Sequence, residues 1–180
     1  RRSAAKPGNT VYVSGTIGDG ALGLRAVKGE LSGISEADAA VLIARYRRPE
    51  PRLGLLARLA RETVLAAADV SDGLVADLAH IAEASDVSIV IRADSVLLSP
   101  AACAVLNRNP ALRTAILSGG DDYELIFCAP YTASDTVHTI ATACDVPVTA
   151  IGKVEAGSGV RVIDADGSEI ALDRTGFTHG

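Results

Sequence analysis

The sequence predicts an α+β fold in which a mixed β-sheet is covered by helices. Short β-branched segments alternate irregularly with segments of helical periodicity, which argues against a regular doubly wound fold. The last two apolar segments, 160–163 and 170–172, flank Asp166-Gly167, a dipeptide typical of an antiparallel hairpin. Hydrophobic residues make up 48% of the 180 residues, with only four Tyr and two Phe, so we expect one domain with an aliphatic core.

The chain should begin with a strand and a helix. Val11-Tyr12-Val13 follows a turn signal and predicts the strand. Gly18 and Gly20 then lead into a helix over 20–29. The residues expected to form the inward stripe of this helix are Leu22, Ala26 and Val27.

Two further helices are expected before residue 65. Ser35 followed by Asp38 matches a capping box, so a helix should start there and end before Pro49. A third helix is expected over 52–64. The residues expected to face inward are Val41, Leu42 and Ala44 in the former helix, and Leu55, Leu56 and Leu59 in the latter.

The second half of the chain should continue the irregular alternation. A short apolar segment, 66–70, leads into a helix over 72–84, whose Leu74, Leu78 and Ile81 share one face. The remaining expected elements are, in order, a strand at 87–91, a helix opened by Ser99-Pro100, a strand at 123–128, a helix started by Thr132 and Asp135 and ending near Cys144, and a strand at 148–151.

Composition narrows the classes of function. The net charge is −5, and the only basic cluster is interpreted as the solvated end of a helix, so no nucleic-acid partner is expected. That cluster consists of Arg45, Arg47, Arg48 and Arg52. The three cysteines lack metal-ligand spacing, and no apolar run could span a membrane, so we expect a cytoplasmic protein with reduced thiols. The chain has no Met and opens with Arg1, which indicates processing or a piece of a longer polypeptide.

The first segment that could carry chemistry is Asp69-Val70-Ser71-Asp72-Gly73-Leu74. It gathers two carboxylates and a hydroxyl at an expected helix N-terminus, where free amides favour anions such as phosphate. A cation would have to lie between those carboxylates and a phosphate, and Mg²⁺ takes such ligands. The alternative, favoured from physics alone, is that Ser71 caps the helix and Asp72 complements its dipole. That alternative leaves Asp69 unexplained.

The second such segment is Ser118-Gly119-Gly120-Asp121-Asp122-Tyr123-Glu124-Leu125, where a flexible turn places two acids before a strand. Alternation along the strand would put Tyr123 and Leu125 on one face, and Asp122 and Glu124 on the other. An ordinary acidic turn remains the simpler interpretation.

The third segment is the tail, where Phe177 lies between glycines and could stack on a flat ring or pin the terminus to the core. His80 and His179 are interpreted as surface residues rather than ligands, and His138 lies in a helix with no partner in view.

Taken together, these segments resemble the thiamine-monophosphate kinase family, within the superfamily of aminoimidazole ribonucleotide synthetase-like, ATP-binding proteins. The segments that carry the resemblance are, in order, Arg2-Ser3-Ala4-Ala5-Lys6-Pro7-Gly8, Val11-Tyr12-Val13-Ser14-Gly15, Gly23-Leu24, Arg48-Pro49-Glu50-Pro51-Arg52, Asp69-Val70-Ser71-Asp72-Gly73-Leu74 with Asp77-Leu78, Ser118-Gly119-Gly120-Asp121-Asp122-Tyr123-Glu124-Leu125, and the terminal Gly-aromatic-x-His motif. The resemblance covers essentially the whole chain.

The resemblance implies transfer of the ATP γ-phosphate to thiamine monophosphate, giving thiamine diphosphate. It implies that residues 1–9 link a missing N-terminal domain, the source of further Mg²⁺ ligands and of a homodimer contact, to a C-terminal synthetase-like domain at 10–180. This chain alone should then be inactive. The implied roles are Mg²⁺ binding by Asp69 and Asp72, ATP contact by Ser71, nucleotide contact by Arg2, thiamine contact by Asp121 and packing on thiamine by Phe177.

Three positions depart from the family pattern, and two other interpretations remain open. The family usually has Glu at 121, Trp or Tyr at 177 and Phe at 180, where this chain has Asp, Phe and Gly. One alternative is another ATP-dependent member of the superfamily, such as selenophosphate synthetase or the hydrogenase-maturation relative. The other is a non-catalytic fragment that binds only a nucleotide or a partner chain.

Overall fold

The computed structural model describes residues 3–63 and 66–172 of the chain. Within these residues a six-stranded sheet has the order β2-β4-β1-β5-β3-β6. The strands are β1 (Asn9–Ser14), β2 (Ala66–Asp69), β3 (Ser88–Arg92), β4 (Leu125–Pro130), β5 (Val148–Glu155) and β6 (Gly159–Ile163). The α-helices are α1 (Asp19–Val27), α2 (Glu36–Arg47), α3 (Leu53–Glu62), α4 (Leu74–Ser85), α5 (Pro100–Arg108), α6 (Arg113–Ser118) and α7 (Ser134–Ala143).

The sheet is mixed, as predicted, although the source of the mixture differs from the prediction. Its strand pairs are antiparallel except for β3 and β6, which run parallel. The predicted hairpin between 160–163 and 170–172 is confirmed in part: an antiparallel bridge joins Ile163 to Glu169 and the Ile170 amide donates to the Val162 carbonyl at 2.8 Å, but 170–172 does not form a strand. Ile170 and Leu172 pack their side chains against the core beside α4.

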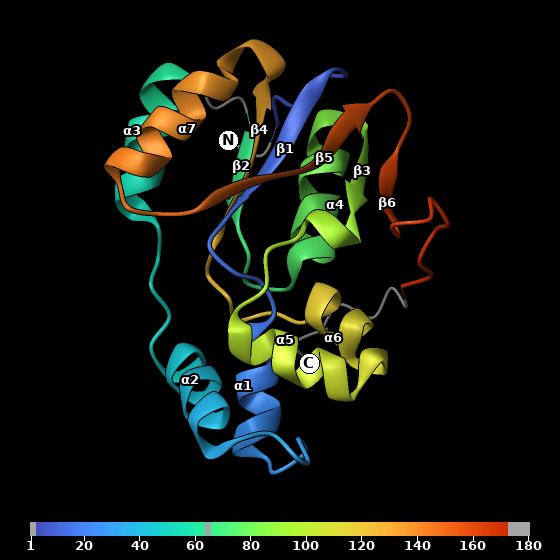
Figure 1. Ribbon diagram of the computed structural model, residues 1–180. Helices are drawn as coiled ribbons and strands as arrows, with labels where there is room; N and C mark the ends of the chain where they lie inside the picture. The colour runs from blue at the N-terminus through green and yellow to red at the C-terminus, as the bar shows by residue number, and fades with distance from the viewer. Residues whose placement is uncertain (1–2, 64–65, 173–180) are drawn as a thin grey trace.

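Helices cover both faces of the sheet, and strand alternation explains which residues meet them. On one face, Val11 and Val13 of β1 share a core with α4, where Leu74, Leu78 and Ile81 are all buried as predicted. On the other face, Tyr12 of β1 belongs to a second core formed with α3 and α7. Figure 1 shows α3 and α7 together on one side of the strands and α4 on the other.

The helices α1, α2, α5 and α6 gather at one end of the sheet (Figure 1), and we call them the helical lobe. The lobe has its own small core, formed by Leu22, Leu42, Ala101, Ala102, Val105 and Ile116. Two of the inward positions predicted for α2 are wrong, because Val41 is 50% exposed and Ala44 is also exposed. Val27, predicted inward in α1, is 45% exposed. Helix α2 buries only Leu42.

Two of the predicted helix starts have the expected caps. The hydroxyl of Ser35 accepts a hydrogen bond from the Asp38 amide at the start of α2, and Ser99 does the same for Ala102 in α5. The start predicted from Thr132 is wrong in detail, because α7 begins after Ala133, which has no side chain able to cap it.

The amino-terminal segment already contacts the domain before β1 begins. Ala5 is buried in the core beside α4, and the Gly8 amide donates to the Val154 carbonyl at 2.9 Å. None of the helices within residues 3–63 and 66–172 is long and apolar enough to cross a bilayer.

Candidate functional site

The topology of the sheet brings the first two segments singled out in the sequence to one place. Strand β4 runs antiparallel to both β1 and β2, so its first residues lie beside the last residues of those two strands. Three connections therefore meet at this edge, between the sheet and the helical lobe. They are 15–18 after β1, 70–73 after β2 and 119–124 before β4.

The connections 70–73 and 119–124 are joined through their backbones. The Asp121 amide donates to the Ser71 carbonyl at 3.0 Å, and the Tyr123 amide donates to the Val70 carbonyl at 2.8 Å. The Val70 amide in turn donates to the Glu124 carbonyl at 2.8 Å. These bonds place the two predicted acidic motifs side by side.

Two glycines make this close approach possible. Gly73 has a φ of +126°, and a Cβ atom there would collide with the Ser118 carbonyl oxygen. A Cβ atom at Gly120 would collide with the carbonyl oxygen of Ser71. Glycine is therefore required at both positions for the connections to pack against each other.

The connection after β2 is organised by Asp77, which sequence reasoning placed in a motif without assigning it a role. Its Oδ2 accepts hydrogen bonds from the amides of Ser71, Asp72 and Gly73 at 2.9, 2.9 and 3.2 Å. Burial raises the pKa of Asp77, while the three amides favour its charged form. The signal in the sequence was an acidic residue one helical turn inside the predicted helix start.

The capping role considered for Ser71 is wrong. The N-cap of α4 is Gly73, and the Ser71 amide donates to Asp77 rather than its hydroxyl accepting from the helix. Since capping does not engage the Ser71 hydroxyl, that group is left for another partner.

Asp69, Asp72 and Asp121 are the carboxylates that remain available at this edge. Asp69 and Asp72 are exposed and Asp121 is half-buried. In the described part of the chain, none of the three side chains takes part in a hydrogen bond or an ion pair. Oxygen donors that face solvent and lack a protein partner are suitable ligands for Mg²⁺, so these residues fit such an ion.

Asp122 differs from its neighbour because it is buried and forms part of the scaffold. Its two oxygens accept from the amides of Gly18 and Gly20 at 2.7 and 2.8 Å, at the start of α1. Burial raises its pKa to about 7, assisted by the nearby charges of Asp19 and Glu124, while the two amides act in the opposite direction. Asp122 thereby fixes the connection 15–18 against the connection 119–124.

Glu124 forms a buried cluster with two arginines. Its carboxylate accepts from Arg52 Nε and Nη2, both at 2.8 Å, from Arg45 Nη2 at 2.9 Å and from the Ser14 hydroxyl at 2.6 Å. The interpretation of the basic cluster as a solvated helix end is therefore wrong for Arg45 and Arg52, whose side chains are 21% and 18% exposed. It holds for Arg47 and Arg48, which are exposed.

The alternation predicted for 122–125 does not apply, because β4 begins only at Leu125. Asp121 and Tyr123 have positive φ values of 69° and 53°, which take the chain out of extended geometry. Such values are unusual for a bulky residue, and they occur often at functional sites. Arg2 and Phe177, the other two predicted site residues, lie outside the described residues.

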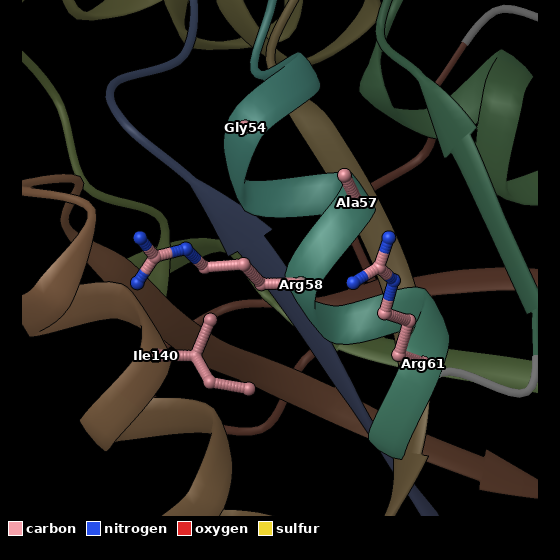
Figure 2. A pocket seen from close by; sticks show the side chains of 5 residues that line it. All are labelled: Gly54, Ala57, Arg58, Arg61 and Ile140. Atoms are coloured by element: carbon pink, nitrogen blue, oxygen red, sulfur yellow. The ribbon is translucent and has the colours of Figure 1, made fainter.

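A separate hollow of about 390 Å³ lies between α3 and α7, away from these carboxylates. It is lined by Gly54, Ala57, Arg58, Arg61 and Ile140, with the two arginines extending from α3 (Figure 2). None of the carboxylates of the three connections lines it.

Comparisons with known proteins show which family the chain matches. Residues 6–165 match the family described as AIR synthase related protein, C-terminal domain. The chain is 42% identical to a thiamine-monophosphate kinase of Caulobacter vibrioides, over 99% of this chain and 50% of that protein. The chain therefore spans about half the length of the curated relatives it matches.

Solved structures that match the chain include two of such proteins, and the chain again covers about half of each. The crystal structure of thiamine-monophosphate kinase from Stenotrophomonas maltophilia K279a matches with a TM-score of 0.83 and 44% identity, covering 94% of this chain and 54% of that one. The structure of AaThiL complexed with AMPPCP and TMP matches with a TM-score of 0.78 and 33% identity, covering 96% and 52%.

Proposed function

The chain belongs to the family of AIR synthase related proteins through their C-terminal domain, and we propose that it is the C-terminal part of a thiamine-monophosphate kinase. The reaction would transfer the γ-phosphate of ATP to thiamine monophosphate and yield ADP and thiamine diphosphate. A relative of this fold was solved in complex with AMPPCP and TMP, which supports a site for a nucleotide and a second phosphate compound.

One observation carries the proposal more than any other. The connection containing Asp69, Ser71 and Asp72 is hydrogen-bonded along its backbone to the connection containing Asp121. Carboxylates that the sequence separates by about fifty positions are thus presented at one edge of the sheet. A phosphoryl transfer between two polyanions needs cation ligands near the place where donor and acceptor meet.

Asp69 and Asp72 would hold Mg²⁺ together with phosphate oxygens. Both carboxylates are exposed and lack a hydrogen bond or ion pair among the described residues, so they need not break any contact to bind. The bound ion would neutralise phosphate charge during the transfer. The Ser71 hydroxyl would contact ATP, and Arg2 would contact the nucleotide from the segment that precedes Ser3.

Asp121 would contact the thiamine substrate. Asp121 has a positive φ of 69° and lies where the two connections meet, since its amide donates to the Ser71 carbonyl. Because Asp is one methylene shorter than the Glu usual in the family, we expect a bridging water in place of a direct contact. Phe177 would pack on the thiamine ring in place of the usual Trp or Tyr.

The chemistry requires little proton transfer from the protein. A phosphate monoester has a second pKa near 6, so the acceptor is largely dianionic at neutral pH. No general base is needed to generate the nucleophile, and direct transfer without a phosphorylated residue is expected. The residues of this chain would orient the reactants and hold the ions rather than react covalently.

Several partners follow from this assignment as parts of the proposal. An N-terminal domain would supply further Mg²⁺ ligands. Residues 1–9 would link it to the synthetase-like domain at 10–180. The whole enzyme would form a homodimer. A cytoplasmic location fits the three cysteines, which are free thiols in the described residues.

The test compares thiamine diphosphate formation by this chain and by the polypeptide translated from its complete reading frame, each given thiamine monophosphate and Mg-ATP. Activity in the longer polypeptide and none in this chain would support both the kinase and a divided active site. Transfer only to another acceptor would reject the substrate assignment and retain the family. A phosphorylated protein residue, trapped on the reaction path, would reject direct transfer.

A further inference from the structure

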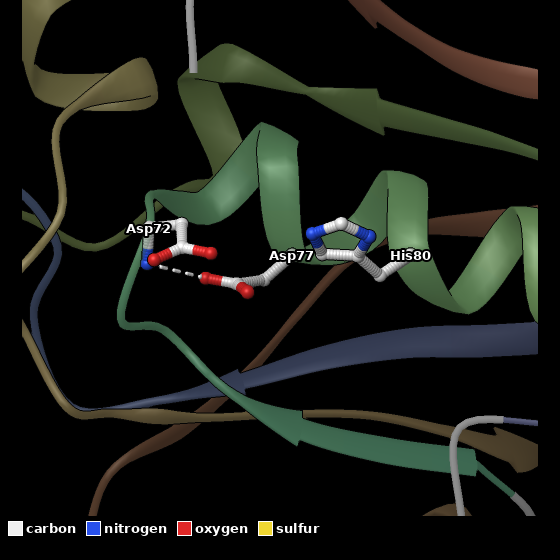
Figure 3. Close-up of side chains that lie close together, drawn as sticks. All are labelled: Asp72, Asp77 and His80. Carbon is white, nitrogen blue, oxygen red and sulfur yellow. Dashed lines mark hydrogen bonds between the residues drawn. The ribbon is translucent and has the colours of Figure 1, made fainter. Parts of the chain in front are cut away.

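Three potential metal ligands lie together at the start of α4. They are Asp72 in the preceding connection and Asp77 and His80 in the helix, and each offers one ligand atom within 4.8 Å of the others. Asp77 and His80 are three residues apart, so they share one face of the helix. In Figure 3 the Asp77 carboxylate lies between the side chains of Asp72 and His80. The proposed kinase function uses only the first of these residues.

The Asp77 carboxylate is held in place through one oxygen and is unpartnered at the other, among the described residues. Its Oδ2 accepts from three backbone amides of the connection 70–73, which fixes the position of the group. Its Oδ1 is buried and has no hydrogen-bond partner among the residues that the structure describes. A buried acceptor normally has a partner, so this oxygen indicates a missing ligand. Partners that orient a coordinating carboxylate are a regular feature of metal sites.

His80 supplies the nitrogen ligand that distinguishes this cluster from a group of carboxylates alone. The residue is exposed, and within residues 3–63 and 66–172 its imidazole has no hydrogen bond or ion pair. A neutral imidazole offers a nitrogen lone pair, which suits Zn²⁺ and its neighbours in the first transition row better than Mg²⁺. Ligand atoms around tetrahedral Zn²⁺ lie about 3.4 Å apart, given bonds of about 2.1 Å. The exposed side chains of Asp72 and His80 would have to rotate to bring the ligand atoms from within 4.8 Å of one another to this spacing.

We propose that Asp72, Asp77 and His80 form a site for a divalent transition-metal ion of the Zn²⁺ or Co²⁺ class. The ion would give the buried Oδ1 of Asp77 the partner that it lacks among the described residues. The site deepens the proposed kinase function, because Asp72 would be shared with the Mg²⁺ that accompanies ATP. Occupation by the transition metal would then compete with productive binding of Mg-ATP. The metal site itself does not depend on the chain being a kinase.

The test titrates this 180-residue chain with Zn²⁺ by calorimetry and with Co²⁺ by visible absorption, without nucleotide and with Mg²⁺ in tenfold excess. We expect one ion per chain and Co²⁺ absorption bands typical of a site with nitrogen and oxygen ligands. His80→Ala should weaken Zn²⁺ binding by at least about tenfold, since it removes one ligand. His138→Ala is the matched control and should leave Zn²⁺ binding unchanged, because His138 is an exposed helical histidine of α7 that hydrogen-bonds within its own helix and meets Tyr12 edge-on, and so belongs to another part of the fold.

Equal Zn²⁺ affinity in the original chain and in His80→Ala would overturn the site, as would loss of binding in the His138→Ala control alone. Circular dichroism of each variant checks that α4 and α7 remain folded. Because the readout is metal binding without nucleotide, failure of the kinase assay would leave this inference standing. Conversely, absence of Zn²⁺ binding would reject the site and leave the kinase proposal intact.

Discussion

The carboxylates at the sheet edge divide into two groups by their surroundings. Asp122 and Glu124 are buried, and each accepts several hydrogen bonds that hold neighbouring segments in place; buried Asp77 does so through Oδ2, while its Oδ1 has no partner among the described residues. Asp69 and Asp72 are exposed and, within the described residues, have no such bonds. The same functional group therefore builds the scaffold in one setting and remains available to a cation in the other.

Removing an available carboxylate should impair catalysis without unfolding the protein. In the polypeptide that shows kinase activity, Asp69→Asn and Asp72→Asn should each lower turnover by about 10- to 100-fold or more and raise the Mg²⁺ concentration needed for half-maximal rate. Steady-state rates across a Mg²⁺ titration give both quantities. Asp135→Asn, an exposed position on α7, is the control and should behave like the original enzyme. Near-normal rates in both site variants would rule out the metal assignment.

The buried Asp122 should make stability depend on pH. Folding raises its pKa from 3.8 to about 7, mainly through burial. Between these values the folded chain binds a proton that the unfolded chain has released, so the free energy of unfolding falls as pH rises from about 4 to about 7. Above about pH 7, Asp122 is ionised in both the folded and the unfolded chain, so its effect on the free energy of unfolding no longer changes with pH. Asp122→Asn cannot titrate and should lack this contribution.

The measurement is urea unfolding of the original chain and of Asp122→Asn at several pH values. The difference between their free energies of unfolding should decrease by up to about 4 kcal/mol across the range, which is the upper limit set by the pKa shift. A difference that stays flat from pH 4 to pH 7 would show that Asp122 does not titrate in this window.

At the residue level, local sequence patterns indicated candidate site residues but did not indicate the hydrogen bonds and ion pairs around them. Asp69, Asp72 and Asp121 stay predictions as site residues, and they are visible in the sequence because they lie in acidic motifs at the ends of expected elements. The partners of Glu124 were not found, since Arg45 and Arg52 lie more than seventy positions away and reach it only through the fold. Long-range ion pairs of this kind carry no local signal.

Among the elements, helix starts are where sequence and structure correspond most directly. Ser35→Ala should lower the free energy of unfolding by about 1 kcal/mol, because the hydroxyl that caps α2 is lost. Thermal or urea unfolding measures the change. Ser134→Ala, at the start of α7 where no serine hydroxyl caps the helix, should change stability by less than about 0.5 kcal/mol. Equal losses in the two variants would contradict the capping role of Ser35.

Element pairing was predicted less well than element type. The helical periodicity of α4 was clear, because a helix that packs on a sheet buries a full stripe. In α2 the same reasoning failed at Val41 and Ala44, since a helix at the rim of a small lobe buries a single position. The parallel pairing of β6 with β3 depends on a distant strand, so the turn at Asp166-Gly167 could not reveal it.

For the molecule as a whole, the site lies where two bodies of structure meet. The sheet with α3, α4 and α7 has two cores, and the helical lobe has a third. Asp122 joins the lobe to the sheet through the start of α1. Glu124 joins them through Arg45 at the end of α2 and Arg52 just before α3. The orientation of the lobe over the carboxylates therefore depends on buried ionic contacts.

Glu124→Gln should loosen this junction. The amide cannot pair with both guanidinium groups and the Ser14 hydroxyl, so the variant leaves buried charge without compensation and should cost about 3 kcal/mol of stability. Glu155→Gln is the control, because its pair with Arg161 is about half exposed and such surface pairs contribute about 0–1 kcal/mol. Urea unfolding compares the two variants.

Hydrogen exchange identifies where the Glu124→Gln loss is located. If Glu124 joins the lobe to the sheet, amides of α2 should exchange faster in the variant, and those of β1 should change less, because β1 keeps its pairing with β4 and β5 on both sides. Uniform acceleration in α2 and β1 would mean that the two bodies open together, and that the cluster stabilises the whole fold rather than the junction. Faster exchange confined to α2 would make Glu124 the residue that sets how the lobe is held against the candidate site.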